Sequence, residues 1–170
     1  MKYILVLLTG FFLSHQVSAQ NQTVSVFNND STIRGTGVII NSQMDGLWKF
    51  LDPKTDRLLQ QGNFEKGEKE GTWIVYHPNN QKQLEAEYKN NLLNGAFREY
   101  DSEGALVLEK IYKDSVQIGT HKEYYGRAGN PEYVNPKQIK IEGQYVEGKR
   151  NGEWLSYYDN GQLGVKQTFN

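Results

Sequence analysis

Apolar and polar residues alternate along several short segments of the chain. Leu84, Ala86 and Tyr88 share one parity, and the intervening Glu85 and Glu87 share the other. Side chains of a β-strand point to opposite faces with a period of two residues, so this segment is a strand with one apolar face. The same alternation recurs within residues 106–112 and 139–145. The pattern predicts an all-β protein.

The strands recur with a period that glycine marks. Successive repeat glycines are separated by 25, 24, 24 and 33 residues, which is the range of solenoids and repeat arrays. Aromatic residues dominate three columns of the repeat: two residues after the glycine, seven residues before it, and five residues after it. The glycines are Gly46, Gly71, Gly95, Gly119 and Gly152; the first column is Trp48, Trp73, Phe97, His121 and Trp154; the second is Phe64, Tyr88, Tyr112, Tyr145 and Phe169; the third is Leu51, Tyr76, Tyr100, Tyr124 and Tyr157.

Each repeat is predicted to be a β-hairpin. Asn80, Gly104 and Gly161 lie nine residues after a repeat glycine, where a short turn favours a residue that tolerates positive φ. The array therefore predicts an elongated single-layer antiparallel sheet of stacked hairpins, with roughly eleven strands starting near Ile33. The first and third columns have opposite parity, so they share a face only if a β-bulge separates them.

The first residues have a different pattern. Lys2, an apolar run over residues 3–13 and a small-x-small motif at residues 17–19 are typical of a secretory signal peptide cleaved before Gln20. An uncleaved anchor is the alternative, although the run is short for a bilayer. We expect a signal peptide at 1–19, a partly ordered lead-in at 20–32 and a repeat domain at 33–170. The leader predicts export to the periplasm or the extracellular space.

Composition argues against several classes of function. The chain has 19 Lys and Arg residues against 20 Asp and Glu residues, and they are interspersed. It therefore lacks the basic stripe that binding to nucleic acid or to anionic membranes requires. Cysteine is absent, and the histidines do not stand at metal-ligand spacing. No Gly-x-Ser-x-Gly motif is present. We predict no metal site, no cofactor and no enzymatic activity.

One column of carboxylates allows a second interpretation. Glu85, Glu109 and Glu142 recur once per repeat, and paired carboxylates can hydrolyse glycosides. A column that recurs in every repeat is more simply a solvated face with cross-strand charge pairs, and we favour that interpretation.

The combined motifs resemble a known family. They are Gly-x-Trp-x-x-Tyr, the turn Asp159-Asn160-Gly161-Gln162-Leu163, and Tyr145-x-x-Gly148-Lys149-x-Asn151-Gly152. This combination resembles the MORN-repeat variant family, known from many bacterial proteins, over about residues 33–169. The resemblance implies an open sheet of hairpins that binds a partner rather than catalysing a reaction. Some bacterial members are labelled as antitoxins of toxin–antitoxin systems, which act in the cytosol, whereas the leader predicts export.

The aromatic columns have two compatible interpretations, a packed core and an exposed ladder that binds a ligand. We predict a protein or peptide as the partner, with a glycan or cell-wall polymer as the alternative. The repeat that begins at Gly119 carries an insertion at residues 126–137, which is rich in glycine and proline. Loops that interrupt a scaffold often carry function. The predicted binding residues are Trp48, Trp73, Tyr76, Phe97, Tyr100, Tyr124, Tyr133, Trp154 and Tyr157.

Overall fold

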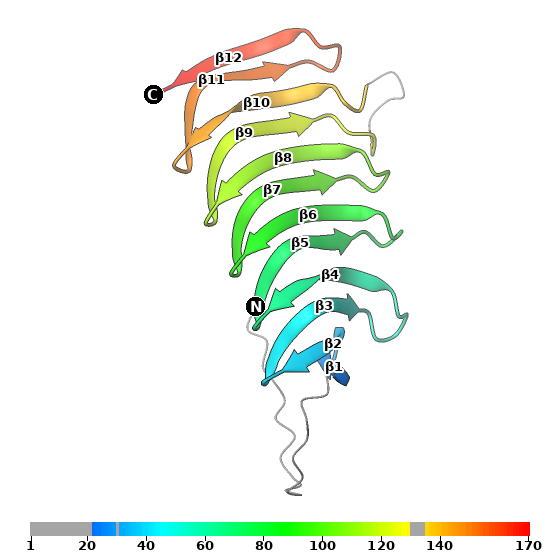
Figure 1. Cartoon of the computed structure of the whole chain (residues 1–170). Coiled ribbons are helices and arrows are strands. Elements are labelled where there is room, and N and C mark those ends of the chain that lie inside the picture. The colour runs from blue at the N-terminus through cyan, green and yellow to red at the C-terminus, as the bar shows by residue number, and fades with distance from the viewer. Residues whose placement is uncertain (1–21, 30, 130–134) are drawn as a thin grey trace, which may run out of the picture.

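The computed structural model describes residues 22–29, 31–129 and 135–170, which form one open antiparallel sheet of 12 strands (Figure 1). The strands follow one another in chain order, and each pairs with the strand before and after it. The fold is thus the predicted all-β, single-layer array of hairpins. The strands are β1 (Gln22–Phe27), β2 (Arg34–Ile40), β3 (Gln43–Leu51), β4 (Leu58–Glu65), β5 (Glu68–Tyr76), β6 (Lys82–Lys89), β7 (Leu92–Tyr100), β8 (Leu106–Lys113), β9 (Val116–Tyr124), β10 (Ile139–Val146), β11 (Lys149–Tyr157) and β12 (Leu163–Phe169).

Two kinds of turn alternate along the array. The tight turns have two residues at positive φ, for example Asn90 at 49° and Asn91 at 65° between β6 and β7. This is the geometry of the type I′ turn, which matches the twist of paired strands. The longer turns include Asn80, Gly104 and Gly161 at φ values of 66°, 82° and 83°. The predicted positions of positive φ are confirmed.

The sheet starts earlier than the sequence pattern suggested. We expected the first strand near Ile33, but β1 pairs with β2 from Gln22 to Phe27. Val24 and Val26 of β1 pack against the core cluster of the sheet. The alternation of residues 22–27 therefore belongs to a strand within the expected lead-in. The predicted signal peptide lies outside the described residues.

A β-bulge in each repeat decides where the ring columns lie. Between β4 and β5, Gln61 pairs with Ile74 and Asn63 pairs with Glu70, so one residue of β4 faces three of β5. The bulge lies at Gly71, whose φ is 68°. The bulge comes before Trp73. From Trp73 to Tyr76 the residues of β5 therefore alternate regularly between the two faces. The first and third columns consequently lie on opposite faces of the sheet.

The sheet buries its core on one face only. The second column shares that face with the first, since the rings of Phe64 and Trp73 meet edge-on with centroids 4.9 Å apart. Trp48, Phe50 and Trp73 are 0%, 5% and 2% exposed. We call this side the tryptophan face, and we call the side that carries the third column the tyrosine face.

Candidate functional site

The tryptophans are structural because each indole lies on the neighbouring strand. A Cβ atom added to Gly62 of β4 would overlap the indole of Trp73. The Trp73 Nε1 atom donates a hydrogen bond to the Asn63 carbonyl at 3.0 Å. Trp48 and Trp154 repeat the arrangement over Gly37 and Gly143, with donation to the carbonyls of Val38 and Gln144. A one-layer sheet thereby buries its largest rings without a second layer.

The residue of the preceding strand that lies beneath a first-column ring differs between tryptophan and the other ring types. Where the first column has Phe97, its partner across the strands is Ala86, and where it has His121, the partner is Lys110. Glycine occurs in this place only under the three tryptophans among the described repeats. Sequence reasoning missed this pairing, although its signal is visible. The small residue stands nine positions before the repeat glycine.

The structure divides the predicted binding residues into two groups. Trp48, Trp73 and Trp154 are at most 3% exposed, so their rings are core and offer no surface to a ligand. Phe97 shares their column and contacts Tyr112 with centroids 5.7 Å apart. Tyr133 lies outside the described residues. The remaining predicted residues, Tyr76, Tyr100, Tyr124 and Tyr157, are half-buried on the opposite face.

Cross-strand pairing joins each of these tyrosines to one residue of the next strand. Tyr76 pairs with Lys82, Tyr100 with Leu106, and Tyr157 with Leu163. Directly paired residues project on the same side of a sheet. We define the tyrosine row as these four pairs, which follow one another along the array with one residue per strand from β5 to β12: Tyr76 and Lys82, Tyr100 and Leu106, Tyr124 and Ile139, and Tyr157 and Leu163.

A charged row runs beside the tyrosine row on the same face. Its members are paired in the order Glu85, Arg98, Glu109, Lys122 and Glu142. The Arg98 Nε atom lies 2.9 Å from Glu109, and its Nη1 atom lies 3.5 Å from Glu85. The hydrogen bond that Arg98 donates to Glu109 raises the pKa of the Arg98 guanidinium. Glu85 and Glu109 thus form the cross-strand charge pairs that the favoured interpretation of the sequence predicted, whereas Glu142 accepts a hydrogen bond from Tyr157.

The outer tyrosines of the row are anchored to polar neighbours. The Tyr157 hydroxyl donates to Glu142 at 2.8 Å, and this bond raises the pKa of the Tyr157 phenol. The Tyr76 hydroxyl accepts a hydrogen bond from Gln61 Nε2 at 3.0 Å. The hydroxyls of Tyr100 and Tyr124 have no hydrogen-bond partner among the described residues. These two hydroxyls remain available to a ligand.

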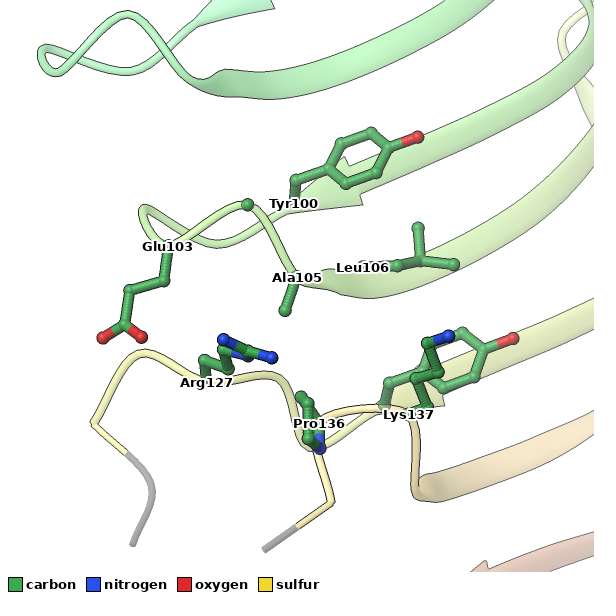
Figure 2. A pocket seen from close by; sticks show the side chains of 9 residues that line it. Tyr100, Glu103, Ala105, Leu106, Arg127, Pro136 and Lys137 are labelled. Carbon is green, nitrogen blue, oxygen red and sulfur yellow. The ribbon is translucent and has the colours of Figure 1, made fainter. Parts of the chain in front are cut away.

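A hollow of about 570 Å³ opens between Tyr100 and Tyr124. Figure 2 shows Tyr100 and Leu106 on the sheet side of the hollow and Arg127 and Pro136 on the loop side. Burial, followed by the charges of Glu109 and Glu142, raises the pKa of the Tyr124 phenol. The lining residues are Tyr100, Glu103, Gly104, Ala105, Leu106, Tyr124, Arg127, Pro136 and Lys137.

Asp101 holds the wall of the hollow in place. Its Oδ2 atom accepts hydrogen bonds from the backbone N–H groups of Arg127 and Ala128, at 2.5 and 2.9 Å. Its Oδ1 atom accepts from Glu103 and Ala105 at 3.0 and 2.9 Å. The first described part of the predicted insertion is therefore fastened to the preceding turn. Local sequence patterns do not reveal this contact, because Asp101 and Arg127 are 26 residues apart.

Two of these repeats match a known protein family. Residues 69–90 and 150–170 match the model of the MORN repeat variant family. Each of these two segments matches as one MORN-type repeat. The matched segments are β5–β6 and β11–β12 with their turns. No curated protein matches the chain. MORN repeats are generally a non-catalytic module.

The two matched MORN repeats share a further contact. In both, the second residue before the repeat glycine is basic and covers the core ring. The Lys69 Nζ atom lies 4.1 Å from the Trp73 ring centroid, and the Arg150 guanidinium carbon lies 4.2 Å from that of Trp154. Burial lowers the pKa of the Lys69 ammonium. The cation shields the indole from solvent, which adds to its structural role.

No helix of the described residues is long and apolar enough to cross a membrane. Within the same ranges, no group of three or more His, Asp or Glu side chains is arranged to hold a metal ion.

Proposed function

We propose that the chain is an exported, non-enzymatic MORN-repeat scaffold that binds a protein or peptide through its tyrosine face. The hollow between Tyr100 and Tyr124 carries this proposal. It combines aromatic and aliphatic side chains with the charged Glu103, Arg127 and Lys137 and with two hydroxyl groups that have no partner in the described chain. Binding sites commonly join an apolar lining to a few convergent polar groups.

The tyrosine face suits binding better than the tryptophan face. On the tryptophan face, the largest rings already pack against the sheet and donate their N–H groups to backbone carbonyls. A ligand there would have to displace that core. On the tyrosine face, the rings are half-buried and fixed at one end by the strands, so binding them costs little conformational entropy.

Tyrosine is well suited to this role because it combines a large apolar surface with a hydrogen-bonding group. The charged row supplies polar groups along the same face, but Glu85 and Glu109 are already ion-paired with Arg98. Their pairing favours a supporting role over general acid–base catalysis.

The export part of the proposal rests on the leader pattern of residues 1–19. N-terminal sequencing of protein recovered from the exported fraction should start at Gln20. Recovery of a cytosolic protein that starts at Met1 would contradict export and would favour the antitoxin alternative.

The binding part is tested with defined ligand sets. The protein is applied to an array of peptides and, separately, to purified peptidoglycan and polysaccharides. We expect retention on peptides, and we expect it to be lost in the Tyr100→Ala/Tyr124→Ala variant. Tyr158→Ala is the matched control, because Tyr158 is an exposed tyrosine outside the tyrosine row, at 59% exposure.

Circular dichroism of each variant establishes that it is folded. Retention on pure glycan without peptide binding would replace the proposal with the carbohydrate-binding alternative. Peptide binding that both variants keep would show that the tyrosine face is not the site.

A further inference from the structure

The spacing of the tyrosine row restricts the shape of a ligand that could lie along it. Tyr76, Tyr100, Tyr124 and Tyr157 stand on β5, β7, β9 and β11, so successive tyrosines are separated by two strands. Paired strands lie about 4.8 Å apart, which places successive tyrosines about 9.6 Å apart along the array. A ligand that runs across the strands meets an equivalent ring at every such interval.

One peptide conformation has nearly this repeat. A polyproline II helix has three residues per turn and rises about 3.1 Å per residue, so every third side chain recurs after about 9.3 Å. An extended strand would need about 10.2 Å for three residues and would turn alternate side chains to opposite sides. The mismatch for polyproline II is about 0.3 Å per tyrosine, and it stays near 1 Å over the whole row.

We propose that the tyrosine row binds a proline-rich segment in the polyproline II conformation. The segment lies across the strands between Tyr100 and Tyr157, and every third residue enters one of the two gaps between successive tyrosines there. This inference rests on the proposed function, because it names the class of peptide that the same face would bind.

The gap between Tyr100 and Tyr124 is the principal subsite. Two tyrosines on strands about 9.6 Å apart leave room for one flat ring between their side chains, since each van der Waals contact takes about 3.5–4.0 Å. Leu106 forms the floor between them, and Pro136 and Ala105 line the loop side. A proline ring fits these apolar walls, and aromatic-lined grooves are known receptors for such helices.

The hydroxyls of Tyr100 and Tyr124 can serve as hydrogen-bond donors to such a segment. A polyproline II segment has no internal hydrogen bonds, so its carbonyl groups need donors from outside. Tyr100 and Tyr124 each present a hydroxyl without a partner in the described chain, whereas Tyr76 and Tyr157 are bonded to Gln61 and Glu142. The two hydroxyls without a described partner thus flank the hollow, and the two bonded hydroxyls, one accepting and one donating, stand at the ends of the row.

The neighbouring gap shows how the chain itself blocks a subsite. Between Tyr76 and Tyr100 the row has Lys82, whose ammonium lies 5.2 Å from the Tyr100 ring centroid and 2.9 Å from Glu85. The equivalent position in the principal gap is Leu106. The Leu106→Lys variant therefore copies an arrangement that this sheet already accommodates, and we expect it to fold.

The test uses fluorescently labelled proline oligomers of three, six and nine residues and a Gly-Ser peptide of nine residues. We expect the wild-type protein to bind proline oligomers and not the Gly-Ser peptide. The affinity should rise from three to six residues and then level off, because Lys82 blocks the third gap. The Leu106→Lys variant should lose at least about tenfold in affinity, as the loss of a central contact does. Tyr158→Ala should bind as the wild type does.

A second peptide pair tests the spacing itself. One peptide carries proline at every third position and the other at every fourth, in the same alanine background. Tighter binding of the first peptide supports the row as the receptor, and equal binding overturns it.

The outcomes separate this inference from the proposed function. If arrayed peptides bind through Tyr100 and Tyr124 but proline oligomers do not, the polyproline II inference is wrong and the proposed function stands. If proline oligomers bind equally to the wild type and to Leu106→Lys, the principal subsite is wrong.

Discussion

Gly62 lies under the indole ring of Trp73, and a Cβ atom added to the glycine would overlap that ring. The contact joins two strands and seals the core of a sheet that has no second layer. We expect Gly62→Ala to destabilise the fold by about 1–3 kcal/mol, as overpacking of a tight contact does. Urea denaturation followed by tryptophan fluorescence measures the change.

Gly164→Ala is the control for this prediction. A Cβ atom at Gly164 would meet its nearest neighbours at 3.4 Å, which is ordinary contact, and the residue lies on an exposed strand. We expect a change within about 0.5 kcal/mol. Equal losses in the two variants would show that the Trp73 contact is not what constrains Gly62.

Each first-column ring packs on a residue of the preceding strand, so we predict that substitutions at His121 and Lys110 have coupled effects on the free energy of unfolding. His121 occupies the tryptophan position, and its ring centroid lies 5.2 Å from that of Trp154. Under the three tryptophans the partner is glycine, whereas here it is a lysine. We expect His121→Trp alone to destabilise the protein, and the His121→Trp/Lys110→Gly variant to recover stability through a coupling of about 0.5–3 kcal/mol. A double-mutant cycle by urea denaturation measures it, and strict additivity would contradict it.

Burial of His121 makes stability depend on pH. Burial lowers the pKa of its imidazole below the ordinary value of about 6.5, although the hydrogen bond with Glu123 acts in the opposite direction. The unfolded chain therefore binds a proton more readily than the folded chain, and stability falls as pH drops from about 6.5 towards the lower folded pKa. Lys110 and Arg150 act in the same direction as burial, and Gln117 bonds the other ring nitrogen.

The comparison of wild type with His121→Phe isolates this effect. The free energy of unfolding is measured for both between pH 7.5 and 5. We expect the wild type to lose stability relative to the variant over the acidic part of this range. A constant difference between the two proteins would show that His121 does not titrate differently in the folded state.

The contact between Asp101 and the loop predicts a local loss of protection. Asp101→Ala removes the acceptor of the Arg127 and Ala128 backbone N–H groups, which should exchange hydrogen faster. Asp52→Ala is the control, because Asp52 accepts from Lys54 and Thr55 within its own turn. Unchanged exchange at residues 127–128 in Asp101→Ala would contradict the anchoring role. Mass-spectrometric hydrogen exchange makes the comparison.

The sequence by itself determined the array and its hairpins. The alternation around Leu84 and the recurring glycines depend on local geometry, because the pleat has a period of two and tight turns need positive φ. The turn position of Asn80 could therefore be predicted from spacing alone, and its φ of 66° confirms it. The family resemblance followed from the same local repeats.

Only the tertiary structure decided which rings are core and which are exposed. The bulge at Gly71 determines which face of the sheet Trp73 points to. Alternation along a single strand does not reveal how that strand is offset from its neighbour. Gly62 acquires its role from a ring that reaches it across the ladder. The hollow beside Tyr100 likewise needs Leu106 from the next strand and a loop that Asp101 holds. These relationships join residues far apart in the chain, so local periodicity does not encode them.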